Sequence, residues 1–199
     1  NTWTSRLKPE NITISIVGNL TEADVRRQLT KVFGDLEPES NVSQNISQEH
    51  RPKGGLVKIE RDVAQSFVVI GMSTCDVLDD DSPAVDVATT ILGGGRSSRL
   101  FVELRDKRGL AYSVGATNGS NKGVGYMATY IGTSPDKTCE SLAGLWSETT
   151  RLRETPVTAD ELERAKNYLL GGYLRSHETN YSQANFLARY SALGMGTEY

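Results

Sequence analysis

Apolar residues recur along the chain at two spacings, every second residue in some stretches and every third or fourth in others, which predict strands and helices respectively. The predicted strands cover residues 12–17, 56–59, 67–70, 112–117 and 126–131, with a turn at Asn118-Gly119 between the last two. The predicted helices cover residues 21–34, 83–92, 98–107, 135–153, 158–178 and 181–193. Strands separated by long helices indicate an α+β fold, in which helices pack on one face of a largely antiparallel sheet.

Residues typical of helix ends and loops support several of these boundaries. Thr158 and Glu161 form a capping box at the start of a predicted helix. Gly109, followed by the apolar Leu110, occupies the position of a left-handed helix C-cap. Residues 37–54 are rich in Pro, Gly, Ser, Asn and Gln and contain few apolar groups, so they predict a linker.

The charge balance narrows the set of partners. The net charge is −3, with Lys and Arg scattered among Asp and Glu, so we expect no surface for nucleic acid or an anionic membrane. No apolar run approaches the ~20 residues of a membrane-spanning helix, and the first residues lack the order of a signal peptide. A soluble protein is expected, in a compartment that the sequence does not indicate.

Residues able to bind metal or act as nucleophiles are few. Cys75 and Cys139 lack CxxC spacing, which excludes a zinc ribbon; a single disulfide and two buried free thiols stay open, and we favour the thiols. His177 begins an HExxH-like string that has Tyr181 at the second histidine position, and His50 ends an HxxEH-like string without its first histidine. The sequence therefore predicts no zinc site in this chain. It also contains no GxSxG motif and no convincing nucleophile–base pair.

Three consecutive glycines, residues 93–95, precede a predicted helix and allow two interpretations. Free backbone N–H groups at a helix N-terminus bind anions, so Gly94, Gly95 and Ser97 form a candidate phosphate or carboxylate site. No Gly-Lys-Ser/Thr sequence follows and no parallel βαβ unit is predicted around the glycines, which argues against a nucleotide site. We favour a tight corner between helices, where glycine supplies positive φ.

The stretch that starts at these glycines is the most distinctive in the chain. Residues 93–114 are Gly-Gly-Gly-Arg-Ser-Ser-Arg-Leu-Phe-Val-Glu-Leu-Arg-Asp-Lys-Arg-Gly-Leu-Ala-Tyr-Ser-Val. This stretch resembles the signature of the second half of pitrilysin/insulinase-family zinc metallopeptidases. Residues 11–36 resemble the strand and helix that close the first half of such enzymes, and residues 156–166 resemble a late helix of the second half. The resemblance runs in order over nearly the whole chain.

The resemblance implies two homologous α+β halves around a chamber for peptides. In this family the first half carries the HxxEH zinc ligands and general base, whereas the second half usually lacks metal ligands and supplies an Arg and a Tyr that reach the substrate. The matching residues here are Arg105 and Tyr112. Spacing alone favours interpreting Arg105 as a solvated charge on a helix and Tyr112 as an ordinary half-buried tyrosine of a strand. The resemblance reverses this preference and favours a role for both residues in substrate binding. The neighbouring Arg96, Arg99 and Arg108 are interpreted as surface charges.

The same resemblance predicts domain boundaries. Residues 1–36 are assigned to the closing strand and helix of the catalytic half, residues 37–54 to a linker, and residues 55–199 to the second half, which stops before its own last strand. Because the halves are homologous, one hypothesis is that residues 12–36 fill that vacancy by pairing with the sheet of residues 55–131. The alternative form of this hypothesis is a domain-swapped homodimer, in which two copies of the chain exchange residues 12–36.

These expectations combine into a substrate-binding region of a zinc-dependent metalloendopeptidase. The chain itself is expected to bind no zinc and to be inactive alone, because zinc belongs to an HxxEH-bearing half in cis or in trans. Its expected partners are that half and a peptide substrate. Two alternatives stay open: a non-catalytic scaffold or partner subunit of the processing-peptidase or respiratory-core-protein type, and a small-anion-binding module at residues 93–98.

Overall fold

The computed structural model describes residues 9–36 and 54–196, and the chain forms two compact units. One unit comprises Asn1–Asn45 with Gly172–Tyr199, and the other comprises Ile46–Gly171. The division falls inside helix α4 (Ala159–Ser176), whereas the sequence assigned residues 55–199 to one region. The predicted linker lies outside the described residues except for Gly54. The assignment of segments to the halves of a larger protein stays a prediction.

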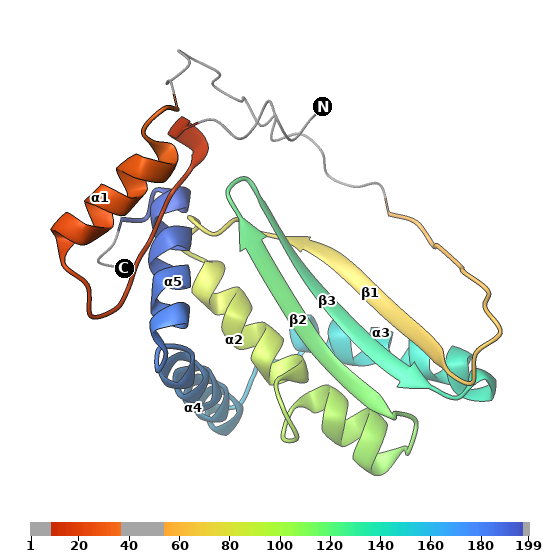
Figure 1. The fold of residues 1–199 in the computed structure, drawn as a ribbon. Coiled ribbons are helices and arrows are strands. Elements are labelled where there is room, and N and C mark those ends of the chain that lie inside the picture. Colours follow the sequence, from red (N-terminus) through yellow and green to blue (C-terminus); the bar gives the residue numbers. More distant parts are fainter. Residues whose placement is uncertain (1–8, 37–53, 197–199) are drawn as a thin grey trace. The chain divides into compact units, whose positions relative to one another are not determined.

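The larger unit, Ile46–Gly171, contains a three-stranded antiparallel sheet (Figure 1). Its strands are β1 (Ser66–Thr74), β2 (Ser113–Asn121) and β3 (Val124–Thr133), in the order β1-β3-β2. Tyr130 of the central strand β3 lies opposite Val69 of β1 and Gly115 of β2. Alternate residues of β1 pack against the core, as the sequence alternation predicts, and these are Val68, Ile70 and Met72.

Helices cover one face of this sheet and close the core. The helical segments of this unit are α2 (Ser82–Gly93), the π-helix η2 (Phe101–Lys107), the short 3-10 helix η3 (Pro135–Lys137), α3 (Thr138–Glu154) and the first part of α4. Helix α3 contacts β1 and β3, and α2 contacts β2. The buried core consists of Leu92, Leu100, Leu104, Leu110, Met127, Ile131 and Leu145. The predicted α+β fold is confirmed.

The smaller unit contains η1 (Pro9–Asn11), α1 (Glu22–Phe33), α5 (Asn180–Leu193) and the end of α4. Thr21 caps α1 by accepting a hydrogen bond from the N–H of Asp24 at 3.2 Å, and Thr179 caps α5 through the N–H of Ser182 at 3.1 Å. Neither α1 nor α5 has a buried residue. Local capping therefore sets where these two helices begin.

The helices of both units share one further property. Among the residues that the structure describes, none of the helices combines the length and the apolar character needed to cross a bilayer.

Two of the predicted strands do not form. Residues 12–17 and 56–59 take no strand conformation, and the sheet of the described residues contains only β1, β2 and β3. Ile14 is 44% exposed and Leu56 is 90% exposed. Alternation marks a segment that suits a pleated surface, but a strand also needs a neighbour to complete its backbone hydrogen bonds. The hypothesis that residues 12–36 complete this sheet is therefore wrong.

The hairpin between β2 and β3 turns later along the chain than predicted. Asn118 and Gly119 lie inside β2, and the turn is at Lys122-Gly123, where Gly123 has φ of +81°. A Cβ on Gly119 would lie 2.8 Å from the ring of Tyr126 on β3, so this glycine makes room for a cross-strand aromatic side chain. Asn-Gly predicts a turn only where the glycine has no such packing role.

The three consecutive glycines form a corner between α2 and η2, and packing explains two of them. Gly93 ends α2 against β2, and a Cβ there would lie 1.9 Å from the backbone nitrogen of Ala116. A Cβ on Gly94 would lie 2.7 Å from the carbonyl oxygen of Thr90. Of the three, only Gly95 has positive φ, at +87°. The predicted corner therefore depends more on close packing than on left-handed backbone.

We expect Gly93→Ala to lower the unfolding free energy of the larger unit by about 3 kcal/mol, because the backbone of α2 or β2 must move to admit a Cβ. Gly71→Ala is the matched control, since Gly71 lies exposed in β1 with nothing within 4 Å of its Cβ position. That control should be neutral or slightly stabilising, because alanine restricts the unfolded chain. Urea denaturation measures both, and equal stabilities would contradict the packing assigned to Gly93.

Candidate functional site

Arg105 lies on a helix with uncommon hydrogen bonding. Its helix η2 is a π-helix, a form that occurs frequently at functional sites. The side chain of Arg105 is exposed, and its guanidinium lies 5.0 Å from the centroid of the Phe101 ring. Within the described part of the chain this guanidinium has no hydrogen bond or ion pair. Its five N–H donors are therefore available to a ligand.

A left-handed glycine cap fixes the turn after η2. Gly109 has φ of +58°, and its N–H donates to the carbonyl of Arg105 at 3.1 Å. The N–H of Leu110 donates to the carbonyl of Leu104 at 2.8 Å, and both leucine side chains are buried. The hydroxyl of Thr133 on β3 donates to the carbonyl of Leu110 at 2.7 Å. The predicted C-cap is confirmed, and the corner is anchored to the sheet.

Tyr112 leaves this corner just before β2 begins. Its N–H donates to the carbonyl of Gly132 on β3 at 2.8 Å, which fixes its backbone. Its side chain is 60% exposed, and its hydroxyl has no hydrogen bond within the residues described. No hydrogen bond joins Tyr112 to Arg105. The two side chains thus stand at opposite ends of one anchored corner, and neither makes a hydrogen bond or ion pair within the part of the chain that the structure describes.

Arg99 holds the start of this helical segment to α4. Its Nε donates to Oε1 of Glu161 at 2.6 Å, and its Nη2 donates to Oε2 at 3.0 Å. The side chain of Arg99 is 6% exposed and that of Glu161 is 19% exposed. The interpretation of Arg99 as a surface charge is therefore wrong. Sequence spacing shows which residues share a helix face, but not that another helix covers that face.

The other end of η2 is held to α3. A Cβ on Gly144 would lie 2.6 Å from Cδ2 of Leu104, so the two helices pack very closely there. Nη2 of Arg108 donates to Oε1 of Glu140 on α3 at 2.9 Å, in an exposed ion pair. The backbone that carries Arg105 is thus fixed by α4 at one end and by α3 at the other.

The buried ion pair also changes the titration of Glu161. Hydrogen bonds from Arg99, aided by the N–H of Thr158 at 2.9 Å, hold the pKa of Glu161 at about 2, below its ordinary value of 4.5. The hydroxyl of Thr158 in turn accepts from the N–H of Glu161 at 3.2 Å, which completes the predicted capping box. One carboxylate therefore caps α4 and binds Arg99.

This pKa predicts a loss of stability in acid. The unfolded state takes up the Glu161 proton near pH 4.5 and the folded state near pH 2, so the stabilisation is present above pH 4.5 and is lost as the pH falls toward 2. We expect Glu161→Gln, which has no carboxylate to protonate, to be less stable than the wild type at pH 7. Between pH 4.5 and 2 the unfolding free energy of this variant should fall less than that of the wild type. Urea denaturation from about pH 5 to about pH 2.5 tests this. Parallel pH profiles for the two proteins would contradict it.

The candidate anion site at the glycines has fewer free donors than expected. The N–H of Gly94 donates to the carbonyl of Thr90 at 2.7 Å. The hydroxyl of Ser98 donates to the carbonyl of Gly95 at 2.7 Å. Ser97 is exposed. An anion site at Gly94, Gly95 and Ser97 stays a prediction.

Comparison with known proteins decides the family. Residues 2–169 match the family model described as the peptidase M16 inactive domain. The chain belongs to the peptidase M16 family. The resemblance inferred from residues 93–114 is thereby confirmed.

The M16 relatives include both zinc proteases and a non-peptidase. The chain is 31% identical over 172 residues to an uncharacterized zinc protease of Streptomyces coelicolor. The aligned region covers 82% of this chain and 37% of that protease. It is 32% identical over 198 residues to the non-peptidase homolog YmxG of Helicobacter pylori, and the aligned region covers 86% of this chain and 46% of that homolog. A crystal structure of a peptidase M16 inactive domain from Pseudomonas fluorescens matches with a TM-score of 0.78 at 26% identity, over 92% of this chain and 43% of that one. The chain spans less than half the length of these M16 proteins.

The described residues of this M16 domain do not fit a zinc ion. Among them, no group of three or more His, Cys, Asp or Glu is placed to hold a metal. The ring of His177 lies between those of Tyr173 and Phe186, with centroids 4.0 and 4.3 Å away, and its Nδ1 is 2.8 Å from the carbonyl of Tyr173. His177 therefore belongs to an aromatic cluster. His50 lies outside the described residues.

The two cysteines of the M16 domain are free thiols. Cys75 is partly buried and Cys139 is exposed, so the expectation of two buried thiols is wrong. Burial and the nearby Asp79 raise the pKa of the Cys75 thiol. A raised thiol pKa is the opposite of what an activated nucleophile needs.

Proposed function

We propose that this chain is the substrate-binding part of a zinc-dependent metalloendopeptidase, and that Arg105 and Tyr112 bind the peptide. One observation carries the proposal: both side chains are exposed, form no hydrogen bond or ion pair among the described residues, and stand at the two ends of one anchored corner. Polar groups that are held in place but left unsatisfied suit a ligand, because their geometry is set before the ligand arrives.

Arg105 and Tyr112 act on different parts of the peptide in this proposal. The guanidinium of Arg105 donates to a backbone carbonyl or carboxylate of the substrate, which its planar set of N–H donors fits. The phenol of Tyr112 donates to the oxygen that gains negative charge when the scissile carbonyl is attacked. Zinc, held by an HxxEH-bearing half in cis or in trans, supplies the activated water when bound. The peptide lies enclosed between the two halves, and this chain alone is inactive.

The length of the relatives supports a second, catalytic region. The matched region covers 37% of the Streptomyces zinc protease and 46% of the Helicobacter homolog, so each has room for another half.

A non-catalytic partner or scaffold subunit is the second candidate function. It is favoured by the Helicobacter relative, which at 32% identity is named a non-peptidase homolog. In that case the same corner would bind a partner segment or a peptide without cleaving it.

Peptide cleavage by the zinc-loaded protein separates these functions. The chain is produced together with its HxxEH-bearing half and offered a broad panel of fluorogenic peptides, as wild type and as the Arg105→Ala/Tyr112→Phe double variant. We expect cleavage by the wild type and its collapse in the variant at unchanged zinc content. A zinc-loaded wild type that cleaves none of the peptides would overturn the peptidase proposal and favour the scaffold.

A further inference from the structure

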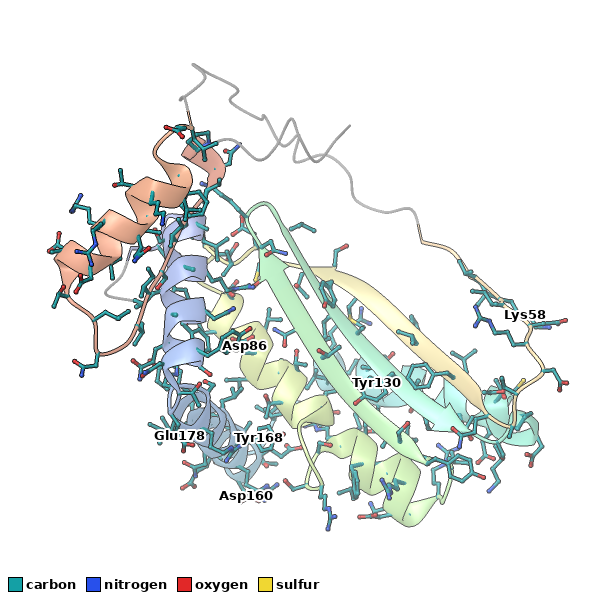
Figure 2. The ribbon with its side chains drawn as sticks, in the orientation of Figure 1. Lys58, Asp86, Tyr130, Asp160, Tyr168 and Glu178 are labelled. Carbon is teal, nitrogen blue, oxygen red and sulfur yellow. The ribbon has the colours of Figure 1, made fainter. Side chains whose placement is uncertain are left out.

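A cavity of about 440 Å³ opens in the larger unit beside the glycine corner. That volume is in the range of small-ligand sites. The residues that line it come from α2, η2, β2, β3 and α4 and from the glycine corner. Two of them, Tyr130 of β3 and Tyr168 of α4, are labelled in Figure 2. The lining comprises Thr89, Thr90, Gly93, Gly94, Gly95, Arg96, Phe101, Val114, Ala116, Thr117, Asn118, Tyr130 and Tyr168.

Glycines shape the walls of this cavity. A Cβ on Gly95 would lie 3.2 Å from the ring of Tyr168, where the φ of +87° already favours glycine. A Cβ on Gly115 would lie 2.8 Å from the hydroxyl oxygen of Tyr130. Gly93 admits no Cβ against Ala116. These small residues let the side chains of Tyr130 and Tyr168 lie directly on the backbone, so rings form part of the cavity wall beside threonine, asparagine and small apolar residues.

The large side chains of the lining all suit an aromatic guest. Phe101, Tyr130 and Tyr168 offer ring faces and edges, and pairs of rings attract one another beyond their buried area. Arg96 is exposed and has no ion pair or hydrogen bond within the described residues, so its guanidinium can lie over a guest ring. Arg105 already makes this contact with Phe101, at 5.0 Å.

We propose that this cavity binds an aromatic side chain of a peptide. Phe101 connects the cavity to the site, because this residue lines the cavity and its ring contacts the guanidinium of Arg105. A peptide held by Arg105 therefore passes the cavity opening, and an aromatic residue along it enters. The inference rests on the proposed function in that the ligand is a peptide, and it names the side-chain class that this region selects.

Binding of two matched peptides to the 199-residue chain tests the proposal without any cleavage step. The probes are acetylated, amidated alanine pentapeptides that carry either Phe or Ala at the central position. Binding is followed by the backbone amide signals of Gly93, Gly94 and Gly95 in two-dimensional NMR. We expect the Phe peptide to shift these signals and to bind about tenfold tighter than the Ala peptide, which corresponds to 1.4 kcal/mol.

A cavity-filling variant makes the test specific. Thr117 is exposed and lines the cavity, so Thr117→Trp should occupy it and abolish the preference for Phe. Ser73→Trp is the matched control, since Ser73 is an exposed residue of β1 outside the lining, and it should keep the preference. A thermal unfolding curve for each variant shows whether it is folded.

Three results would overturn the proposal: equal binding of the Phe and Ala peptides, a Phe preference that survives in a folded Thr117→Trp variant, or glycine signals that respond to inorganic phosphate but not to the Phe peptide. The last would favour the small-anion site at Gly94, Gly95 and Ser97. A failure of the proposed function has a different outcome, in which the Phe peptide binds the cavity while the zinc-loaded protein cleaves nothing.

Discussion

Tyr112→Phe is expected to lower kcat/KM for peptide cleavage about 100- to 1,000-fold, or ~2.7–4 kcal/mol of transition-state stabilisation, in the zinc-loaded protein with its HxxEH-bearing half. The variant keeps the ring and loses only the hydroxyl, which lacks a protein partner in the described structure. If the hydroxyl binds the oxygen that becomes charged only during the reaction, the loss falls mainly on kcat, and KM changes little. Steady-state kinetics with one fluorogenic peptide measures the split.

Arg105→Ala should weaken the same reaction differently. A guanidinium that holds the ground-state peptide contributes to KM as well as to kcat, so we expect KM to rise in this variant. Tyr112→Phe should leave stability unchanged, because the hydroxyl has no hydrogen bond among the described residues. Arg105→Ala should lower the unfolding free energy by at most about 0.5–1 kcal/mol, because the exposed Arg105 loses only its contact with the Phe101 ring.

Two matched controls separate this site from the rest of the surface. Tyr126→Phe removes the hydroxyl of another exposed tyrosine of the same unit, and Arg61→Ala removes another exposed arginine. Both controls should retain wild-type kinetics. Equal losses in controls and site variants, or wild-type kinetics in Tyr112→Phe, would show that Tyr112 is not a substrate-binding residue.

The second large effect concerns stability. We expect Arg99→Ala to lower the unfolding free energy by about 3–5 kcal/mol, because the change leaves the carboxylate of Glu161 largely buried without its partner. The helical segment that carries Arg105 also loses its attachment to α4. The midpoint temperature of thermal unfolding should fall by roughly 6–20 °C for a chain of this length.

Arg164→Ala is the control for this stability effect. Arg164 forms an ion pair with Asp160 on the same helix α4, but its side chain is 47% exposed and that of Asp160 is 74% exposed. An exposed pair one helical turn apart contributes about 0.3–0.5 kcal/mol. Similar losses for Arg99→Ala and Arg164→Ala would mean that burial of the Arg99–Glu161 pair contributes little.

The local signals in the sequence located most of the structure. A capping box placed the start of α4, and Gly109 with Leu110 placed the end of η2. These signals work because a cap is a hydrogen bond between residues three to six positions apart, so the sequence contains both partners. The stretch of residues 93–114 also indicated the family and nominated Arg105 and Tyr112.

The wrong strand and turn predictions both concern contacts with a neighbouring strand, which spacing along the chain does not show. Residues 12–17 have the alternation of a strand, but the sheet of the described residues gives them no neighbour. Asn118-Gly119 has the composition of a turn, but the ring of Tyr126 across the hairpin requires a glycine inside the strand. In both cases local propensity agreed with the prediction, and the outcome depended on a neighbouring strand, which Gly119 has and residues 12–17 lack among the described residues.

The sequence by itself determined the α+β class, the principal helices, the caps and the identity of the two side chains proposed to bind substrate. Only the tertiary structure decided that Arg99 is buried against Glu161, that Gly93 and Gly115 have no room for a side chain, and that rings from three separate elements surround one cavity. The physical reason is range: hydrogen bonds within one turn follow from adjacent residues, whereas burial and cavity shape depend on which distant elements pack together.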